Sequence, residues 1–197
     1  MLNKSNKMKN VRLSLWSIVI CFMSVACSKT NDFVVAMNQV GKLTSKTTVM
    51  EIETIFKKDS IVKRLSEGLL GFQGAYMQED DKYLIYALDG KHLMTITPRE
   101  PLDSLSTIRF VDIYDARYKT KEGIGLNSTF EEINLWTTID KIETTFTKAT
   151  LYLTALNATM TLDKKDLGIR SLSTEEVISE QIPNLVKPTS FVLWFEQ

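Results

Sequence analysis

Side chains suited to covalent, redox or metal chemistry are scarce in this chain of 197 residues. There is one histidine, His92, and there are two cysteines, Cys21 and Cys27, which lie six positions apart in an apolar run that then becomes polar. A Ser-His-Asp device needs an imidazole beside an activated serine, and the sequence has no Gly-x-Ser-x-Gly turn to supply one. The two cysteines could be a redox pair, metal ligands, or part of a segment that directs the protein to its place in the cell.

The start of the chain, over 1–26, has the charge pattern of a secretory signal. Lys4, Lys7, Lys9 and Arg12 precede a mostly apolar and uncharged run over 13–26. This run is shorter than the roughly 20 residues of a typical transmembrane helix. A basic start followed by a short apolar run therefore predicts that the protein is exported.

The end of the apolar run resembles the lipobox of bacterial lipoproteins. It reads Ser24-Val25-Ala26-Cys27, with small residues at 24 and 26 followed directly by cysteine. The resemblance implies that the Cys27 thiol is acylated and becomes the new N-terminus, while Cys21 leaves with the signal. No cysteine then remains for a disulfide or a metal, so the mature fold must be stable through its core alone. The alternative is an ordinary signal peptide with an incidental cysteine.

Composition and net charge restrict the classes of partner that this protein could bind. The chain has 44% hydrophobic and 24% charged residues, which is ordinary for a globular protein with a core. Of 24 basic and 24 acidic residues, four cations leave with the signal, so the mature domain carries a slight excess of acidic residues. Such a domain lacks the basic field that phosphate backbones require, so we expect no nucleic-acid partner and expect the membrane to be contacted through the acyl anchor. Ser28 after the cysteine fits sorting to an outer membrane, facing the periplasm.

Two similar segments of the sequence indicate a duplication. The segment over 47–62 (TTVMEIETIFKKDSIV) aligns without a gap with the segment over 128–143 (STFEEINLWTTIDKIE). The same offset places Phe110-Val111 over Phe191-Val192. The predicted organisation is a signal peptide over 1–26, a lipidated tether with a possible first strand over 27–39, a first repeat over 40–120 and a second over 121–197.

Each copy has signals for one helix and about three strands. Thr47 and Ser128 are predicted N-caps, with glutamate in the first helical turn. Asp89-Gly90 between two apolar runs predicts a hairpin, since glycine readily takes positive φ, and Asn157 is the matching turn in the second copy. The sequence predicts an α+β fold of two tandem α-β-β-β units, an antiparallel sheet with helices on one face.

Aromatic residues near the ends of the two units form the candidate binding surface: Tyr114, Tyr118, Phe191, Trp194 and Phe195. Alternate residues of a strand face opposite ways, so Phe191 and Phe195 share one face and Trp194 takes the other. An exposed aromatic row on a sheet is a candidate contact surface. The same residues could instead pack in the core.

The acidic and glycine-rich segments lack the spacing of a ligand site. Glu79, Asp80 and Asp81 precede a predicted strand without the pattern of a calcium loop. The GIG segment over 123–125 precedes a helix but lacks the further glycine or P-loop lysine of a nucleotide site. We expect no metal, no cofactor and no catalytic residues, and His92 is predicted to occupy a surface position of the hairpin.

A lipobox followed by tandem units of one helix and several strands resembles uncharacterised families of bacterial envelope lipoproteins. There is a distant likeness to the SmpA/OmlA-type module and to the two-repeat architecture of β-lactamase inhibitor proteins. The likeness covers most of 40–195 and rests on topology, length and the fragment over 125–133. It implies a surface that contacts another protein, although the disulfides of those relatives are absent here.

These patterns predict a lipid-anchored, non-catalytic module that binds another protein of the cell envelope. One alternative is an inhibitor or immunity protein that blocks a toxin or an enzyme, which an acidic patch complementary to a basic active site would favour. Another is a hydrolase with a carboxylate-based site, which would need two facing carboxylates in a pocket. A passive structural component of the envelope is a further alternative.

Overall fold

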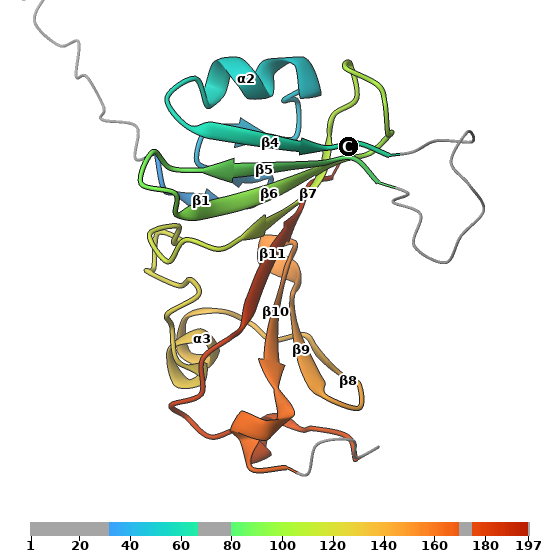
Figure 1. Cartoon of the computed structure of the whole chain (residues 1–197). Helices are drawn as coiled ribbons and strands as arrows, with labels where there is room; N and C mark the ends of the chain where they lie inside the picture. Colours follow the sequence, from blue (N-terminus) through green and yellow to red (C-terminus); the bar gives the residue numbers. More distant parts are fainter. Residues whose placement is uncertain (1–31, 67–79, 170–174, 197) are drawn as a thin grey trace, which may run out of the picture. The chain divides into compact units, whose positions relative to one another are not determined.

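The computed structural model describes residues 32–66, 80–169 and 175–196, and these form a mostly β structure (Figure 1). An eight-stranded antiparallel sheet has the order β4-β5-β6-β7-β11-β10-β9-β8, and a three-stranded sheet has the order β1-β2-β3. The strands are β1 (Val35–Ala36), β2 (Gln39–Val40), β3 (Leu43–Thr44), β4 (Ser60–Arg64), β5 (Lys82–Tyr86), β6 (His92–Pro98), β7 (Ile108–Ile113), β8 (Lys141–Thr144), β9 (Lys148–Leu153), β10 (Ala158–Asp163) and β11 (Ser190–Trp194). The helices are η2 (Val49–Glu51), α2 (Ile52–Ile55), α3 (Phe130–Trp136), η4 (Thr154–Leu156), η5 (Lys164–Leu167) and η6 (Ser179–Gln181).

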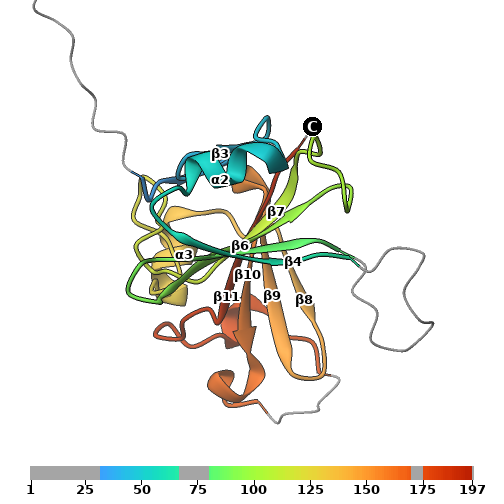
Figure 2. The same ribbon diagram turned by 45° about the horizontal axis from the view of Figure 1, so that its top comes forward.

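The prediction of an α+β fold with α-β-β-β units is wrong. Within the described residues the α-helices are α2 and α3; both are short, and each is followed by four strands, β4 to β7 or β8 to β11. The strand missing from the prediction in each copy is an edge strand, and every residue of β4 except Ile61 is exposed. Edge strands are often polar and charged, so they lack the apolar run that identifies a buried strand. Figure 2 shows α2 and β3 on the same side of the β4–β7 half.

One row of apolar residues crosses all eight strands and relates the two halves of the sheet. Neighbours in the row are registered pairs, in the order Ile61, Ile85, Met94, Ile113, Phe191, Met160, Leu151 and Ile142. The six inner members are at most 2% exposed. Burial of each such side chain contributes roughly 1.5–3 kcal/mol. Outward from the middle of the sheet, one half has the order β7-β6-β5-β4 and the other has the order β11-β10-β9-β8. The halves therefore meet edge to edge through their equivalent last strands, β7 and β11.

The offset between the two halves is not constant along the chain. Ile142 lies at the predicted offset from Ile61. Met160 takes the place of Met94 in the row, but the offset from Met94 to Met160 is shorter. The connections after β4 and after β10 differ in length from their counterparts, which changes the offset.

The predicted alignment of Phe110 with Phe191 is therefore wrong. A shift by an odd number of positions moves a strand residue to the opposite face of the sheet. Phe191 is fully buried on the inner face. Phe110 lies between the buried Val111 and the half-buried Arg109 and, by alternation with Val111, takes the outer face.

The helical segments of the two halves share a backbone-to-glutamate hydrogen bond at their start. The backbone N–H of Thr48 donates to Oε2 of Glu51 at 2.8 Å, and that of Thr129 donates to Oε2 of Glu132 at 2.8 Å. These are capping boxes, in which the glutamate satisfies an amide at the helix start. Each cap lies one residue later than predicted.

The two turns predicted from local sequence are confirmed. β5 and β6 pair antiparallel around Asp89-Gly90, where Gly90 has φ +82°. β9 and β10 pair antiparallel, and Asn157 precedes β10 with φ 51°. The first of these hairpins carries part of the candidate site. Within the described residues, no helix is long and apolar enough to cross a membrane.

Candidate functional site on the outer face of the sheet

The candidate site lies on the outer face of the sheet, opposite the buried apolar row. Because neighbours in a strand alternate, β7 turns Val111 and Ile113 inward and Asp112 outward. Asp112 is in register with Thr95 of β6 and Val192 of β11. We call the following side chains the outer-face cluster: Tyr86, His92, Phe110, Asp112, Tyr114 and Trp194.

Three rings stack at one end of the cluster. The centroids of Tyr86 and His92 are 4.7 Å apart, and those of His92 and Tyr114 are 4.1 Å apart, with interplanar angles of 22° and 18°. Nε2 of His92 lies 3.1 Å from the carbonyl oxygen of Met94 and 3.1 Å from Oγ1 of Thr95. Burial lowers the pKa of His92 and outweighs the opposing hydrogen bond to Met94, which favours the neutral ring. The imidazole is thus a spacer that joins two tyrosines.

A second aromatic contact lies toward the other end of β7. Phe110 is in register with Trp194 of β11, and their ring centroids are 4.7 Å apart. The guanidinium carbon of Arg109 lies 5.1 Å from the Phe110 centroid, within cation–π range. Its Nη2 donates to Oδ2 of Asp80 at 2.5 Å, so this cation is already paired.

Asp112 lies between the two aromatic groups. It is two positions from Phe110 and two from Tyr114, and side chains at this spacing on a strand are about 7 Å apart. The Asp112 side chain is half-buried, and burial raises the pKa of its carboxyl, while Lys82 acts in the opposite direction. Nothing in the described part of the chain donates a hydrogen bond to this carboxylate or lies within ion-pair distance of it.

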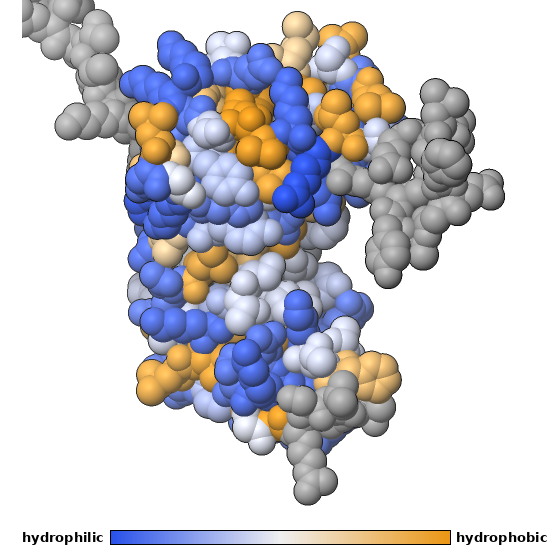
Figure 3. All heavy atoms as spheres, in the orientation of Figure 1, coloured by the Kyte–Doolittle hydropathy of each residue, from blue (hydrophilic) through white to orange (hydrophobic). Residues whose placement is uncertain are grey.

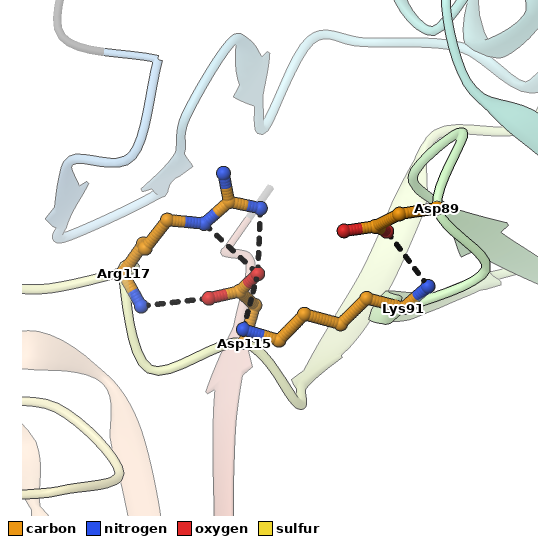
Figure 4. Close-up of polar contacts among 4 residues, drawn as sticks. All are labelled: Asp89, Lys91, Asp115 and Arg117. Atoms are coloured by element: carbon orange, nitrogen blue, oxygen red, sulfur yellow. Dashed lines mark hydrogen bonds and ion pairs between the residues drawn. The ribbon is translucent and has the colours of Figure 1, made fainter.

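An ion-pair cluster is centred on Asp115, the residue that follows Tyr114 in the sequence (Figure 4). The buried carboxylate of Asp115 accepts bonds from Nε and Nη2 of Arg117 at 3.0 and 2.7 Å and lies 3.2 Å from Nζ of Lys91. Burial alone would raise the pKa of Asp115, but these bonds outweigh it and lower the pKa to about 2. Lys91 belongs to the hairpin that carries His92. The cluster therefore holds that hairpin against the end of β7.

The structure divides the five aromatic residues predicted as a surface. Tyr114 and Trp194 lie on the outer face, 52% and 40% exposed. Tyr118, Phe191 and Phe195 are at most 3% exposed and belong to the core, so the prediction of a common surface is wrong for these three. Phe191 lies in the apolar row, and only the register between β7 and β11 determines that.

Other predicted features have structural roles or lie outside the described residues. Cys27, the signal over 1–26 and Glu79 are among the latter. Asp81 is 2% exposed and accepts the backbone N–H groups of Ser66 and Leu102 at 2.7 and 2.8 Å. Across residues 32–66, 80–169 and 175–196, no group of three or more His, Cys, Asp or Glu could hold a metal ion.

Four members of the cluster were not part of the predicted surface: Tyr86, His92, Phe110 and Asp112. The signal that could have found two of them is the alternation in FVDIY, which places Phe110, Asp112 and Tyr114 on one face of a strand. His92 lies in the predicted hairpin but is half-buried between two rings. The cluster draws on several strands, so its assembly is not visible in local sequence.

The cluster is separate from the cavity beside α2. That cavity has a volume of about 420 Å³ and is lined by apolar and charged residues, among them Phe33, Ile55, Lys57, Lys58 and Tyr118, and by no member of the cluster. Figure 3 shows apolar surface over α2 and β4, in a small area bordered by hydrophilic residues. The outer-face cluster differs from both because it combines exposed rings with an unpaired carboxylate.

Comparison with known proteins identifies a shared fold. No family model matches the sequence, and no curated protein matches it. Among solved structures, the chain is similar to the uncharacterized protein yfeY from Escherichia coli, with a TM-score of 0.51 and 13% identity over 82% of this chain and 99% of that chain. At this identity the likeness shows the fold alone.

Proposed function

We propose that this protein is a lipid-anchored, non-catalytic binding module that contacts another protein of the cell envelope through the outer face of its sheet. The observation that carries the proposal is the outer-face cluster, in which two ring groups flank a half-buried carboxylate. Exposed tyrosine and tryptophan are the side chains that most often dominate protein interfaces, because they bury a large area at a small entropy cost. Tyr114 and Trp194 are such residues.

Rigidity of this face supports binding. The cluster is built on β5, β6, β7 and β11, which are inner strands of the sheet and are paired in register with their neighbours. The stack around His92 and the ion pairs of Asp115 hold its side chains in place. A pre-organised surface loses less entropy when a partner docks, so more of the contact energy appears as affinity.

The proposed anchor places the partner near a membrane. Only the short segment over 28–31 separates Cys27 from Asp32, where the described structure begins. A chain of this length spans less than about 20 Å even when fully extended. If Cys27 is acylated, the sheet lies close to the bilayer, and a partner must be a membrane protein or a protein held near the membrane.

Site-specific photo-cross-linking in cells tests the binding function. A photoreactive phenylalanine analogue at position 194 or 114 is expected to give a discrete higher-mass adduct. The control is the same analogue at Leu135 of α3, which is 71% exposed and is not part of the outer face. Absence of adducts at both outer-face positions, or equal adducts at Leu135, contradicts the proposal. Mass spectrometry of the mature N-terminus tests the anchor separately, with Cys27→Ser as control.

A further inference from the structure

We infer that the outer-face cluster receives an arginine side chain of the protein partner, with Asp112 as its counter-ion and the Phe110 and Tyr114 rings on either side of it. The inference rests on the proposed binding function and names the chemistry of the partner. Neither the sequence resemblance nor the shared fold assigns this site.

The first argument is the unsatisfied carboxylate. Asp112 is half-buried on a rigid strand, and within the described residues it has neither a hydrogen-bond donor nor an ion-pair partner. Partly buried carboxylates are normally paired or hydrogen-bonded, because removing the charge from water is costly. By contrast, Asp115 of the same segment is fully buried and accepts bonds from Arg117. A charged donor from outside would satisfy Asp112 when the face is covered.

The second argument is the ring groups on either side. Side chains two positions apart on a strand lie about 7 Å apart, so a cation bonded to Asp112 lies near Phe110 on one side and Tyr114 on the other. A guanidinium is planar, donates two parallel bonds to a carboxylate and stacks on aromatic faces, whereas a lysine ammonium is a compact, strongly hydrated charge. The protein already uses this contact itself, since the Arg109 guanidinium lies over the Phe110 ring.

Charged groups of the protein near Asp112 do not take this place. Lys82 lies on β5 and acts on the Asp112 carboxyl through space, but beyond ion-pair distance. Arg109 is paired with Asp80 at 2.5 Å. The neighbouring hydroxyl of Thr95 lies 3.1 Å from His92 Nε2. The position over Asp112 is thus available to a partner's side chain.

The test is an NMR titration of the full-length protein in detergent micelles with two capped tripeptides, Ac-Ala-Arg-Ala-NH2 and its citrulline counterpart. Citrulline has the shape of arginine without the charge. We expect the arginine peptide to shift the Trp194 indole and the Asp112 and Tyr114 amide signals, with at least fivefold weaker binding of the citrulline peptide. Asp112→Asn, which keeps the size of the side chain, is expected to weaken arginine binding at least fivefold.

Two controls separate the site from general electrostatics and from misfolding. Glu131→Gln removes the same charge from an exposed position of α3 and is expected to leave the titration unchanged. Lys82→Met removes the cation that lowers the pKa of the Asp112 carboxyl and is expected to leave arginine binding unchanged or stronger. An unchanged amide spectrum outside the outer face shows that Asp112→Asn still folds.

The inference is overturned if the arginine peptide shifts none of these signals at tens of millimolar, if citrulline binds equally well, or if folded Asp112→Asn binds arginine as the parent does. Cross-linking at position 194 in the Asp112→Asn background distinguishes this failure from that of the proposed function. Adducts that persist while the arginine titration fails leave the binding function standing and overturn the arginine site. If the parent protein itself gives no adducts, both the binding function and the arginine site are contradicted.

Discussion

Replacing Asp115 with asparagine is expected to destabilise the protein by about 2 kcal/mol at pH 7. The carboxyl is fully buried and its pKa is lowered from 3.8 to about 2 by Arg117 and Lys91, after the opposing effect of burial. Each pKa unit corresponds to roughly 1.4 kcal/mol, which gives the expected magnitude. The asparagine keeps the size of the side chain but loses the charge that both cations surround.

The pH dependence of this loss follows from linkage. Because the folded pKa lies below the unfolded one, the stabilisation is complete above about pH 5 and falls as the pH drops toward the folded pKa. The difference in unfolding free energy between the parent and Asp115→Asn should therefore shrink to roughly half at pH 3 and to less than about 0.5 kcal/mol at pH 2. Urea denaturation of both proteins from pH 2 to pH 7 measures it. A difference that does not change with pH, or one below about 0.5 kcal/mol at pH 7, refutes the assigned role of this ion-pair cluster.

Further predictions concern the equivalence of the two halves and the ring stack. Met94→Ala and Met160→Ala should each cost about 2–5 kcal/mol in urea denaturation, because both side chains are fully buried in the apolar row; a loss below about 1 kcal/mol in either would contradict the row as the core of the sheet. Thr129→Ala should cost about 0.5–2 kcal/mol, since it removes the hydroxyl that accepts the backbone N–H of Glu132, whereas the Thr48 hydroxyl donates to Glu51 and Thr48→Ala should cost less; a loss in Thr48→Ala as large as that in Thr129→Ala would contradict this difference between the two helix starts. The pKa of His92 should lie below its ordinary value of 6.5 in an NMR titration. This residue then contributes stability above pH 6.5, and the contribution is lost as the pH falls. His92→Phe should abolish this pH-dependent contribution, and a pKa above 6.5 would contradict the buried stack.

Local signals in the sequence identify the local features of the fold. Aspartate and glycine at 89–90 predict the hairpin through the backbone angles they allow, and threonine followed by glutamate predicts a helix start. The edge strands β4 and β8 escape prediction because Ile61 and Ile142 are their only apolar residues packed against the core. The assumption of one constant offset then assigns the wrong face to Phe110.

The candidate site depends on pairing between distant strands. Tyr114 and Trp194 were predicted as surface residues and are exposed, but which of the five aromatic residues face outward is set by the register of β7 against β11. Asp112 carries no distinctive signal in the sequence, since a single acid in an apolar strand has several ordinary explanations. Only the fold shows that it has no partner among the described residues and that rings lie on both sides of it.

Hydroxyl-radical footprinting of Trp194 and Trp136 tests the binding surface most directly. Trp194 lies on the outer face and is 40% exposed, and Trp136 lies on α3 and is 59% exposed, so each serves as the reference for the other. Oxidation in intact cell envelopes is compared with oxidation of the purified protein. We predict that the envelope protects Trp194 and leaves Trp136 unchanged, whereas equal oxidation of Trp194 in both samples would contradict a protein partner on this face.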